Sequence, residues 1–425
     1  MSSHALILIN IVARNRWLST DACSPSVLDV PHRTSPRKAA LAEAAADLFG
    51  RRGYHAVSVN DIACAAGVTG PAVYRHFGSK QDVLAHVLLT GLEVFGQVSD
   101  EALAGTQAAD EALRGMLEAV AALAVERREI TALWRWQGGH LPKPDRTTIR
   151  RAGGRIMDHW AVALRAVRPA LAPDHAELLC WAALSVFGSV SVHHLSLPRK
   201  RFEALLSALA AAVLSHSVEV AAAPVVNGAG GLAWLAPASR REELLSAATR
   251  LFRERGYHAV SMEDIGGVAG IAGPSIYRYF AGKADILVAA GYRMADRLRQ
   301  DAERALGEAA GPGDALDRLV RSYVDTVLRS DNLLAVFTTE SVAMAERDAK
   351  ELLRIQRAYV AEWVRLLVST APSLTDREAR ITVHAALTIV NDLTRTPRLA
   401  ARPGIAAELV GLARAVLRAG AHWAD

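Results

Sequence analysis

Apolar and polar residues follow one another along most of the chain with the period of an amphipathic α-helix. In the segment 37–52 the apolar residues recur three and four positions apart and share one helix face. These residues are Leu41, Ala44, Ala45, Leu48 and Phe49. Ala, Leu, Arg and Glu, which lose little free energy in a helix, recur throughout, and alternating β-branched runs are few. The pattern predicts an all-α protein.

Three short helices are predicted near the start of the chain. The amphipathic helix 37–52 ends at Gly53, a residue suited to a left-handed C-cap. Ser58 and Asp61 have the spacing of a capping box, so a second helix begins at Val59 and continues to residue 66. Gly67 supplies a tight turn, and a third helix follows over residues 69–76. Two short helices joined by a glycine-containing turn are typical of a helix-turn-helix.

The same pattern occurs twice, at an offset of 203 positions. Segment 37–84 aligns with segment 240–287 without a gap, and 25 of the 48 positions are identical. The offset persists further along, where Trp160 falls on Trp363 and Ala182-Ala183 on Ala385-Ala386. The chain is therefore predicted to be a tandem duplication of one helical unit, joined by a linker rich in Gly, Ala and Pro.

The predicted organisation has six parts. Residues 1–35 are expected to be a disordered leader, or the result of a start codon assigned too early, because the apolar run 5–12 lacks the flanks of a signal peptide. The first copy has a helix-turn-helix domain at 36–82 and a helical effector and dimerisation domain at 83–220. The linker covers 221–239. The second copy repeats the two domains at 240–285 and 286–425.

The net charge and the cysteines exclude few classes of protein. The net charge of +5 permits a polyanionic partner without establishing one. Segment 37–84 has six Lys and Arg against four Asp and Glu, and segment 240–287 has seven against six, so neither is a strongly basic patch. The three cysteines are widely spaced, which suits a reducing cytoplasm and argues against a structural zinc site.

Other classes of protein find little support. The apolar run 178–192 is too short for a membrane span and is expected to be a buried or interface helix. His193 and His194 are adjacent and do not face each other on a helix, so no metal site is expected. No sequence motif for a nucleotide, a cofactor or a hydrolytic centre occurs, and no enzymatic activity is expected.

The segment GYHAVSVNDIACAAGVTGPAVYRHFGSKQDVL, which begins at Gly53, resembles the DNA-binding domain of the TetR family of bacterial transcriptional regulators. The second copy, GYHAVSMEDIGGVAGIAGPSIYRYFAGK, resembles it too. Aromatic residues at the end of the third helix and a Lys at the start of the fourth make the resemblance specific. It covers about 48 residues of each copy. The remainder of each copy agrees with the family only in length, helicity and position.

The resemblance implies roles at the matching positions. Serines cap the second helix and touch phosphate, tyrosines and lysines reach phosphate, arginines add backbone or base contacts, and the remaining residues line the groove-facing side of the third helix. In the first copy these residues are Ser58, Thr69, Gly70, Pro71, Ala72, Tyr74, Arg75, His76 and Lys80. In the second copy they are Ser261, Gly273, Pro274, Ser275, Tyr277, Arg278, Tyr279 and Lys283. Since Gly, Pro and Ala begin the third helix, direct base readout is expected to be sparse and DNA shape to matter.

The two copies differ where DNA binding is expected. Thr69 is able to cap the third helix of the first copy, whereas its counterpart Ala272 is not. The second helix of the second copy carries Gly266 and Gly267 where the first has Ala63 and Cys64. We therefore expect the second helix-turn-helix to be looser and to contribute less to DNA binding.

An apolar effector cavity is expected in each copy, lined by aromatic residues with polar anchors. The candidates in the first copy are Trp134, Trp136, His140, Trp160 and Trp181. Those in the second copy are Phe337, Glu340, Tyr359 and Trp363. A role in the hydrophobic core is the alternative for all of these aromatic residues.

The resemblance implies a cytoplasmic, sequence-specific DNA-binding regulator, a ligand-responsive repressor whose partners are a double-stranded operator and a small apolar ligand. Two complete units in one chain suggest a covalent pseudo-dimer on one operator. A homodimer with four helix-turn-helix units is the alternative. A ligand-sensing or scaffold protein with degenerate DNA binding is a third interpretation.

Overall fold

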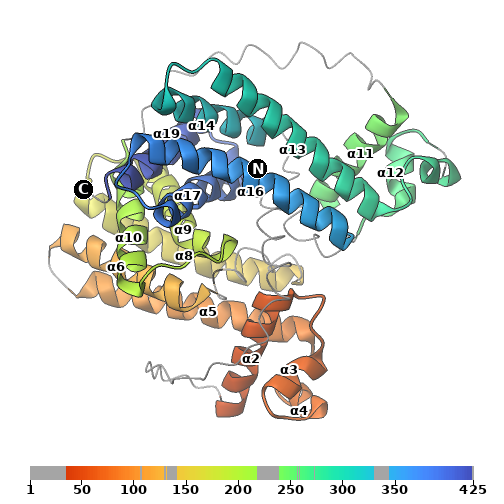
Figure 1. The fold of residues 1–425 in the computed structure, drawn as a ribbon. Helices are drawn as coiled ribbons and strands as arrows, with labels where there is room; N and C mark the ends of the chain where they lie inside the picture. The colour runs from red at the N-terminus through yellow and green to blue at the C-terminus, as the bar shows by residue number, and fades with distance from the viewer. Residues whose placement is uncertain are drawn as a thin grey trace. The chain divides into compact units, whose positions relative to one another are not determined.

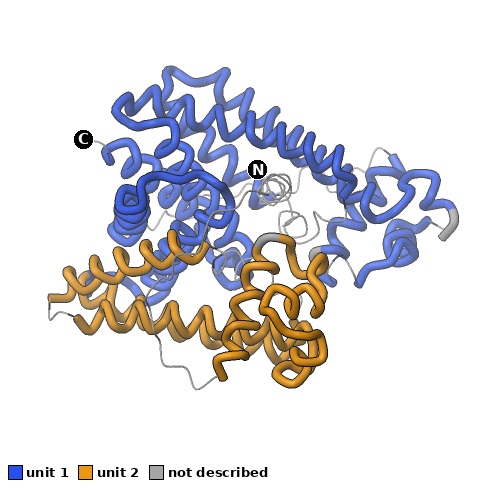
Figure 2. The backbone as a smooth tube through the Cα atoms, turned by 60° about the horizontal axis from the view of Figure 1, so that its bottom comes forward, with its two compact units in different colours: residues 1–9, 168–425 blue, residues 10–167 orange. Residues whose placement is uncertain are grey.

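The computed structural model describes residues 35–105, 108–128, 131, 141–217, 239–255, 257, 259–271, 273–329 and 344–423. Within these ranges every regular element is a helix and none is a strand (Figure 1). The predicted all-α fold is confirmed. The chain forms two compact units, one within residues 10–167 and the other within residues 168–425 (Figure 2).

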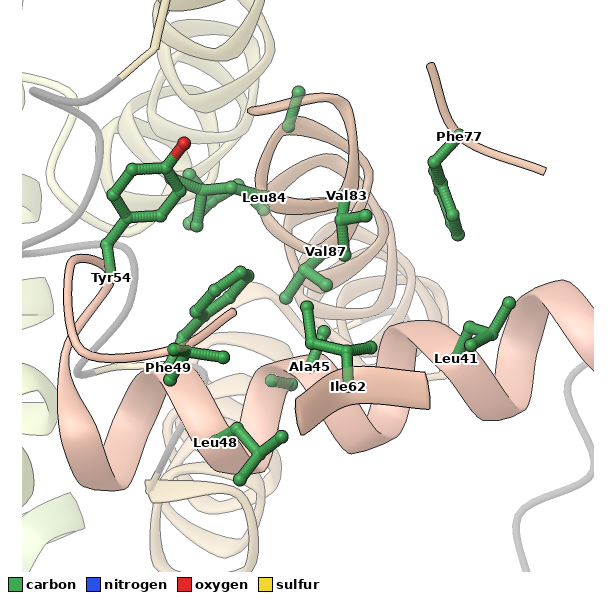
Figure 3. Packing of buried hydrophobic residues seen from close by; sticks show 14 of the residues in the cluster. Leu41, Ala45, Leu48, Phe49, Tyr54, Ile62, Phe77, Val83, Leu84 and Val87 are labelled. Atoms are coloured by element: carbon green, nitrogen blue, oxygen red, sulfur yellow. The ribbon is translucent and has the colours of Figure 1, made fainter. Parts of the chain in front are cut away.

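The first unit contains the first helix-turn-helix and the helices that follow it. Its helices are α2 (Pro36–Arg52), α3 (Val59–Ala65), α4 (Gly70–Tyr74), α5 (Lys80–Ala104), α6 (Ala109–Glu126) and α8 (Lys143–Val167). Helices α2, α3 and α4 pack with the start of α5 around a shared apolar core, and we call residues 36–82 the first head. Phe49, Ile62 and Val83 are fully buried in this core (Figure 3).

Helix α8 joins the first head to the rest of the unit. Ile149, near the start of α8, is buried in the same core as the head. Two turns further along α8, Ile156 lies so close to α5 that a Cβ at Gly96 would be 3.3 Å from its Cδ1. Trp160 is fully buried, with its ring centroid 5.5 Å from that of Phe95. The head and the helices behind it therefore share a continuous apolar interior.

The second unit contains the end of the first copy and all of the second copy that is described. From the first copy it takes α9 (Pro173–Gly188), the 3₁₀ helix η3 (Ser189–Val192) and α10 (Arg199–Ser215). From the second copy it takes α11 (Arg240–Arg255), α12 (Met262–Val268), the 3₁₀ helix η4 (Gly273–Arg278), α13 (Lys283–Gly307), α14 (Pro312–Arg329), α16 (Glu346–Thr370), α17 (Asp376–Arg395), α18 (Pro397–Ala400) and α19 (Ile405–Ala421). We call residues 240–285 the second head.

A four-helix bundle in this unit joins the two copies. Helix α9 packs against α17 and α10 packs against α19, while α9 with α10 and α17 with α19 pair within their own copies. The facing residues are apolar along both central helices, where Leu178, Phe187, Ile381 and Ile389 are at most 1% exposed. The apolar run 178–192, expected to be a buried or interface helix, thus packs against the apolar face of α17.

Helix α9 with η3 has the length and mean hydropathy of a membrane span. In the structure, however, 78% of its apolar window is buried inside the protein. It is the single helix of this kind in the described part of the chain. Its apolar surface is covered by α10 and α17, so it is a core helix of the bundle.

Candidate nucleic-acid interface and effector cavity

The capping box predicted at the start of the second helix is present in both heads. In the first head the backbone N–H of Asp61 donates to Ser58 Oγ at 3.1 Å, and the N–H of Ser58 donates to the Asp61 carboxylate at 2.7 Å. Ser261 and Asp264 repeat these bonds at 3.0 and 2.8 Å. The pKa of Asp61 is lowered mainly by a hydrogen bond from the Ser58 hydroxyl at 2.6 Å, and the pKa of Asp264 mainly by the bond from the backbone N–H of Ser261. The caps fix the start of α3 and of α12.

The turn between the two helices of the first head also forms as predicted. Gly67 has φ = 67°, a left-handed conformation that favours glycine. The next helix, α4, runs from Gly70 to Tyr74 and is shorter than the predicted 69–76. Val73 and Phe77 are buried in the head core and seat this helix. We refer to α4 and to its counterpart η4 as the recognition elements.

The predicted cap at Thr69 is wrong in one respect. Thr69 occupies the N-cap position with extended backbone, but its hydroxyl makes no hydrogen bond to the helix. The side chain is exposed instead and stays available to an outside partner. Its counterpart Ala272 lies outside the described residues.

The outer face of the first recognition element carries the side chains predicted to meet DNA. Pro71, Tyr74 and Arg75 are exposed, and Ala72 and His76 are half-buried. The side chain of Tyr74 is 58% exposed, although burial of so large a ring is favourable. An exposed aromatic with a free-standing hydroxyl suits contact with a phosphate backbone. Tyr277 in the second head is 51% exposed at the equivalent position.

Lys80 and Lys283 have a structural role that sequence reasoning missed. The Lys80 ammonium donates to the carbonyl oxygens of Tyr54 and Val57 at 3.0 and 2.9 Å and lies 4.1 Å from the centroid of the Tyr54 ring. Burial lowers the pKa of Lys80. Lys283 bonds the carbonyl of Tyr257 at 2.9 Å in the same way. Each lysine thus ties the loop before the capped helix to the start of the long helix that follows the recognition element.

The second recognition element differs from the first in its helix type. Residues 273–278 form the 3₁₀ helix η4, whereas α4 is α-helical. A 3₁₀ helix is wound more tightly and has poorer hydrogen-bond geometry. Ile276 is buried and anchors η4, Tyr277 and Arg278 are exposed, and Tyr279 is half-buried.

A cavity of about 410 Å³ lies in the second copy between α13 and α16. Its walls are mostly apolar and are formed by Met294, Leu298, Ala302, Leu306, Leu352 and Ile355. Gln356 is 2% exposed and lines the cavity, and its side-chain oxygen accepts no hydrogen bond from the residues that the structure describes. The charged residues of the lining all have ion-pair partners. Arg299 pairs with Glu303 at 2.7 Å within the lining, whereas Arg354 and Glu362 pair with neighbours outside it on α16. The cavity suits an apolar molecule that brings one hydrogen-bond donor to Gln356.

The predicted effector residues that the structure describes lie in different parts of the protein. Tyr359 lines this cavity, and Trp363, 1% exposed, lies behind it with the two ring centroids 6.2 Å apart. Trp160 is a core residue of the first unit, and Trp181 lies half-buried on α9 in the second unit. The other five lie outside the described residues: Trp134, Trp136, His140, Phe337 and Glu340.

The described residues contain no group of three or more His, Cys, Asp or Glu side chains able to hold a metal ion. Cys64 is exposed and Cys180 is buried, and both are free thiols. Burial raises the pKa of Cys180 to about 12, so this thiol is not activated as a nucleophile.

The capped helix, the glycine turn and the exposed recognition element define a helix-turn-helix protein with two heads. A family model described as "Bacterial regulatory proteins, tetR family" matches residues 41–87 and 244–290. The chain therefore carries, in tandem, two segments that match the DNA-binding domain of the TetR family.

Curated relatives match over part of their length. The HTH-type transcriptional activator FasR of Mycolicibacterium smegmatis is 33% identical over 88 residues, which are 21% of this chain and 40% of FasR. The HTH-type transcriptional regulator BetI of Rhizobium meliloti is 30% identical over 117 residues, which are 27% of this chain and 58% of BetI. The chain thus spans about half the length of these relatives. Among solved structures, the TetR family regulator PfmR from Thermus thermophilus is 27% identical, with 41% of this chain and 96% of that chain covered and a TM-score of 0.37.

Proposed function

We propose that this protein is a ligand-responsive transcriptional repressor whose two heads, supplied by one chain, bind the two halves of a single operator. The observation that supports this proposal best is the four-helix bundle in which α9 and α10 of the first copy pack against α17 and α19 of the second. Family members of ordinary length pair two chains to read two half-sites, and here one chain supplies both partners of the pair.

The contacts with DNA follow the usual division between positioning and reading. Tyr74, Arg75, Tyr277 and Arg278 are exposed on the recognition elements and reach the phosphate backbone. The capping serines and the two lysines hold the heads in shape, since their polar atoms are already bonded inside the heads. Sparse base contacts leave much of the specificity to DNA shape.

The cavity supports the ligand response. Helix α13 forms one wall of the cavity and also packs against α11 of the second head, where Arg293 forms an ion pair with Glu242. A ligand that separates α13 from α16 shifts the second head away from its DNA-binding position. Such a ligand lowers operator affinity only if it binds the DNA-incompetent state more tightly.

The test is the mass of the complex with DNA. Light scattering on the protein bound to a fragment of its own promoter is expected to give one chain of 45.5 kDa per operator, with affinity falling steeply as salt is raised. Two chains per operator would indicate the homodimer with four heads. No complex at low salt would indicate the scaffold. A reporter gene on the same promoter distinguishes repression from activation, since FasR is named an activator and KstR2 of Rhodococcus jostii a repressor.

A further inference from the structure

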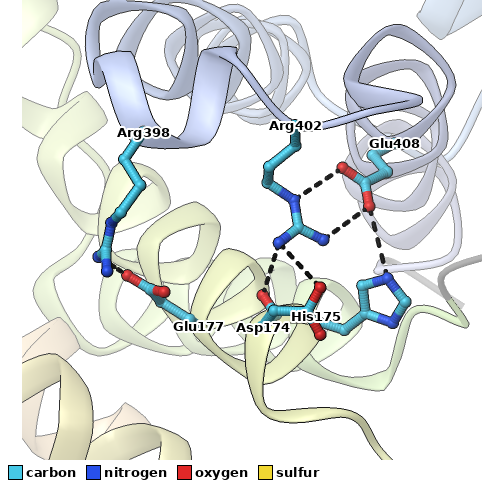
Figure 4. A network of polar contacts seen from close by, with 6 residues as sticks. All are labelled: Asp174, His175, Glu177, Arg398, Arg402 and Glu408. Carbon is cyan, nitrogen blue, oxygen red and sulfur yellow. Dashed lines mark hydrogen bonds and ion pairs between the residues drawn. The ribbon is translucent and has the colours of Figure 1, made fainter.

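The four-helix bundle carries ion pairs between the two copies at its ends. At one end Arg402, which precedes α19, donates to the backbone oxygen of Asp174 at 3.1 Å and to its carboxylate at 3.2 Å. Arg402 also holds Glu408 of its own copy at 3.0 Å, and Glu408 in turn lies 3.7 Å from His175. Beside them Arg398 pairs with Glu177 (Figure 4). The network therefore links α9 of the first copy to α18 and α19 of the second.

A further ion pair joins α10 of the first copy to α17 of the second. Arg201 Nε donates to Glu378 Oε1 at 2.6 Å, and the Glu378 side chain is fully buried. Trp423 Nε1 donates to the same carboxylate oxygen at 3.1 Å, and Thr375 forms a capping box with Glu378. This buried carboxylate depends on the other copy for its charged partner.

The repeat shows that none of these ion pairs has an equivalent on the opposite side of the bundle. A shift of 203 positions relates the acidic residues of α9 to basic residues of α17: Asp174 to Arg377 and Glu177 to Arg380. The same shift relates Arg402 to Arg199, Arg398 to Leu195, Arg201 to Gly404 and Glu378 to His175. Each copy therefore presents a different charge pattern to its partner.

Repulsion between like charges opposes the pairing of two second copies in this geometry. Arg402 would face Arg377, and Arg398 would face Arg380, at both ends of such a pair. Glu378 would lose Arg201 and would approach Glu408, leaving a buried carboxylate without its charged partner. Like charges placed against each other across an interface suppress the wrong partner.

Self-pairing of the first copy keeps one attraction and loses the others. Asp174 would face Arg199, which is favourable. Glu177 would face Leu195, and Arg201 would face His175 in place of a carboxylate. The mixed pair is the one arrangement of the three in which all of the observed ion pairs form.

We infer that these charges form a pairing code, which selects the first copy as the partner of the second and excludes a second copy paired with itself. The inference rests on the intrachain pairing proposed above and adds what enforces it. Its consequence is that every pair joins a first copy to a second copy, so that each pair carries one head of each kind.

The test uses the full chain with a protease recognition sequence inserted between Gly228 and Ala229. The folded protein is cut there, its halves are unfolded and refolded together, and native mass spectrometry reports which halves pair. The expected result is the mixed pair alone. In the variant Arg377→Asp/Arg380→Glu, and separately in Arg402→Asp, pairs of two second halves are expected to appear, since each change removes a repulsion.

A matched control changes the same charges away from the bundle ends. Arg347→Asp/Arg357→Glu alters two exposed arginines of α16 and is expected to leave the mixed pair alone. Three results would each overturn the inference. The first is pairs of two second halves in the unmodified protein, the second is mixed pairs alone in both interface variants, and the third is the same redistribution in the control.

A second measurement tests the inference without cutting the chain, in case the separated halves fail to refold. In the uncut chain Glu177→Arg is expected to lower the urea midpoint of unfolding, and Glu177→Arg/Arg398→Glu to restore it, since Arg398 forms its ion pair with Glu177. No recovery in the double variant would also overturn the inference. The mass-spectrometry experiment measures which halves pair and does not depend on DNA binding. It therefore still tests the inference if the protein binds no DNA or if halves exchange between chains.

Discussion

At the residue scale, most of the polar groups described above act by fixing backbone rather than by meeting a partner. Ser58 and Asp61 bond one another, and Lys80 bonds two carbonyl oxygens. Thr69, Tyr74 and Arg75, by contrast, are exposed, and they are among the side chains proposed to meet DNA. One set of residues therefore holds the backbone of the head in place, and a different set is exposed on its surface.

Operator binding is expected to depend more on Tyr74 than on Tyr277. Tyr74→Ala and Tyr277→Ala each remove one exposed ring, so neither change should unfold its head. We expect the larger loss of operator affinity from Tyr74→Ala, because Tyr74 lies on an α-helical recognition element and Tyr277 on a 3₁₀ helix. Fluorescence anisotropy with a labelled operator measures both, with circular dichroism as the folding control. Equal losses would contradict the expectation.

The Arg201–Glu378 ion pair is expected to make stability depend on pH. Burial raises the pKa of Glu378, but hydrogen bonds from Arg201, Thr375 and Trp423 outweigh it and hold the pKa at about 2, below the usual 4.5. A carboxyl group whose pKa is lowered by folding stabilises the protein above pH 4.5 and loses that stabilisation as the pH falls towards 2.

The variant Arg201→Met is expected to lower the free energy of unfolding by about 1–3 kcal/mol near neutral pH. The difference from the unmodified protein should shrink below pH 4.5 and vanish only below pH 2, where Glu378 becomes protonated in both. Urea unfolding across this pH range measures it. Lys200→Met is the matched control, since the Lys200 side chain is 93% exposed and its partner Glu203 keeps its other ion pair, with Arg199. A pH-independent difference would argue against the assignment.

At the element scale, the two glycines of α12 have different surroundings. A Cβ at Gly266 would lie 2.9 Å from the carbonyl oxygen of Ile271, so the turn packs against this position because no side chain is present. A Cβ at Gly267 would meet nothing within 4 Å. Helix α12 nevertheless has the same seven-residue length and the same capping box as α3.

Substitution of the two glycines is therefore expected to have opposite effects. Gly267→Ala should stabilise the protein by up to about 1 kcal/mol, because alanine loses less backbone entropy in a helix. Gly266→Ala should destabilise it, because the turn has to move away from the new methyl group. Thermal unfolding followed by circular dichroism measures both. Equal effects of the two changes would show that α12 and the turn are not packed as described.

The local elements could be predicted from the sequence because their causes lie close together in it. The capping boxes need a Ser and an Asp three residues apart, and the turn needs Gly67. The bonds of Lys80 could not be predicted, since their acceptors are backbone carbonyls 23 and 26 residues away. The 3₁₀ form of η4 and the missing bond of Thr69 also escaped prediction, because small differences in backbone geometry decide them.

At the scale of the whole molecule, the duplication predicted two units, and the structure has two compact units. Their boundary, however, does not lie at the linker between the two copies. It follows residue 167, because α9 and α10 leave the first copy to pack with the second. The apolar run 178–192 indicated that α9 is buried. The ion pairs at the ends of the bundle could not be foreseen, since each joins residues more than 170 positions apart.

The bundle also sets a condition on how the chain is made. Helix α9 is complete at residue 188, but α17, which covers it from the second copy, ends only at residue 395. At ordinary rates of translation the ribosome takes roughly 10–40 s to add the residues between. Throughout that interval an apolar helix with the composition of a membrane span lacks its partner from the second copy. Every molecule of this protein thus passes through a period of exposure to chaperones and to aggregation before α17 is made.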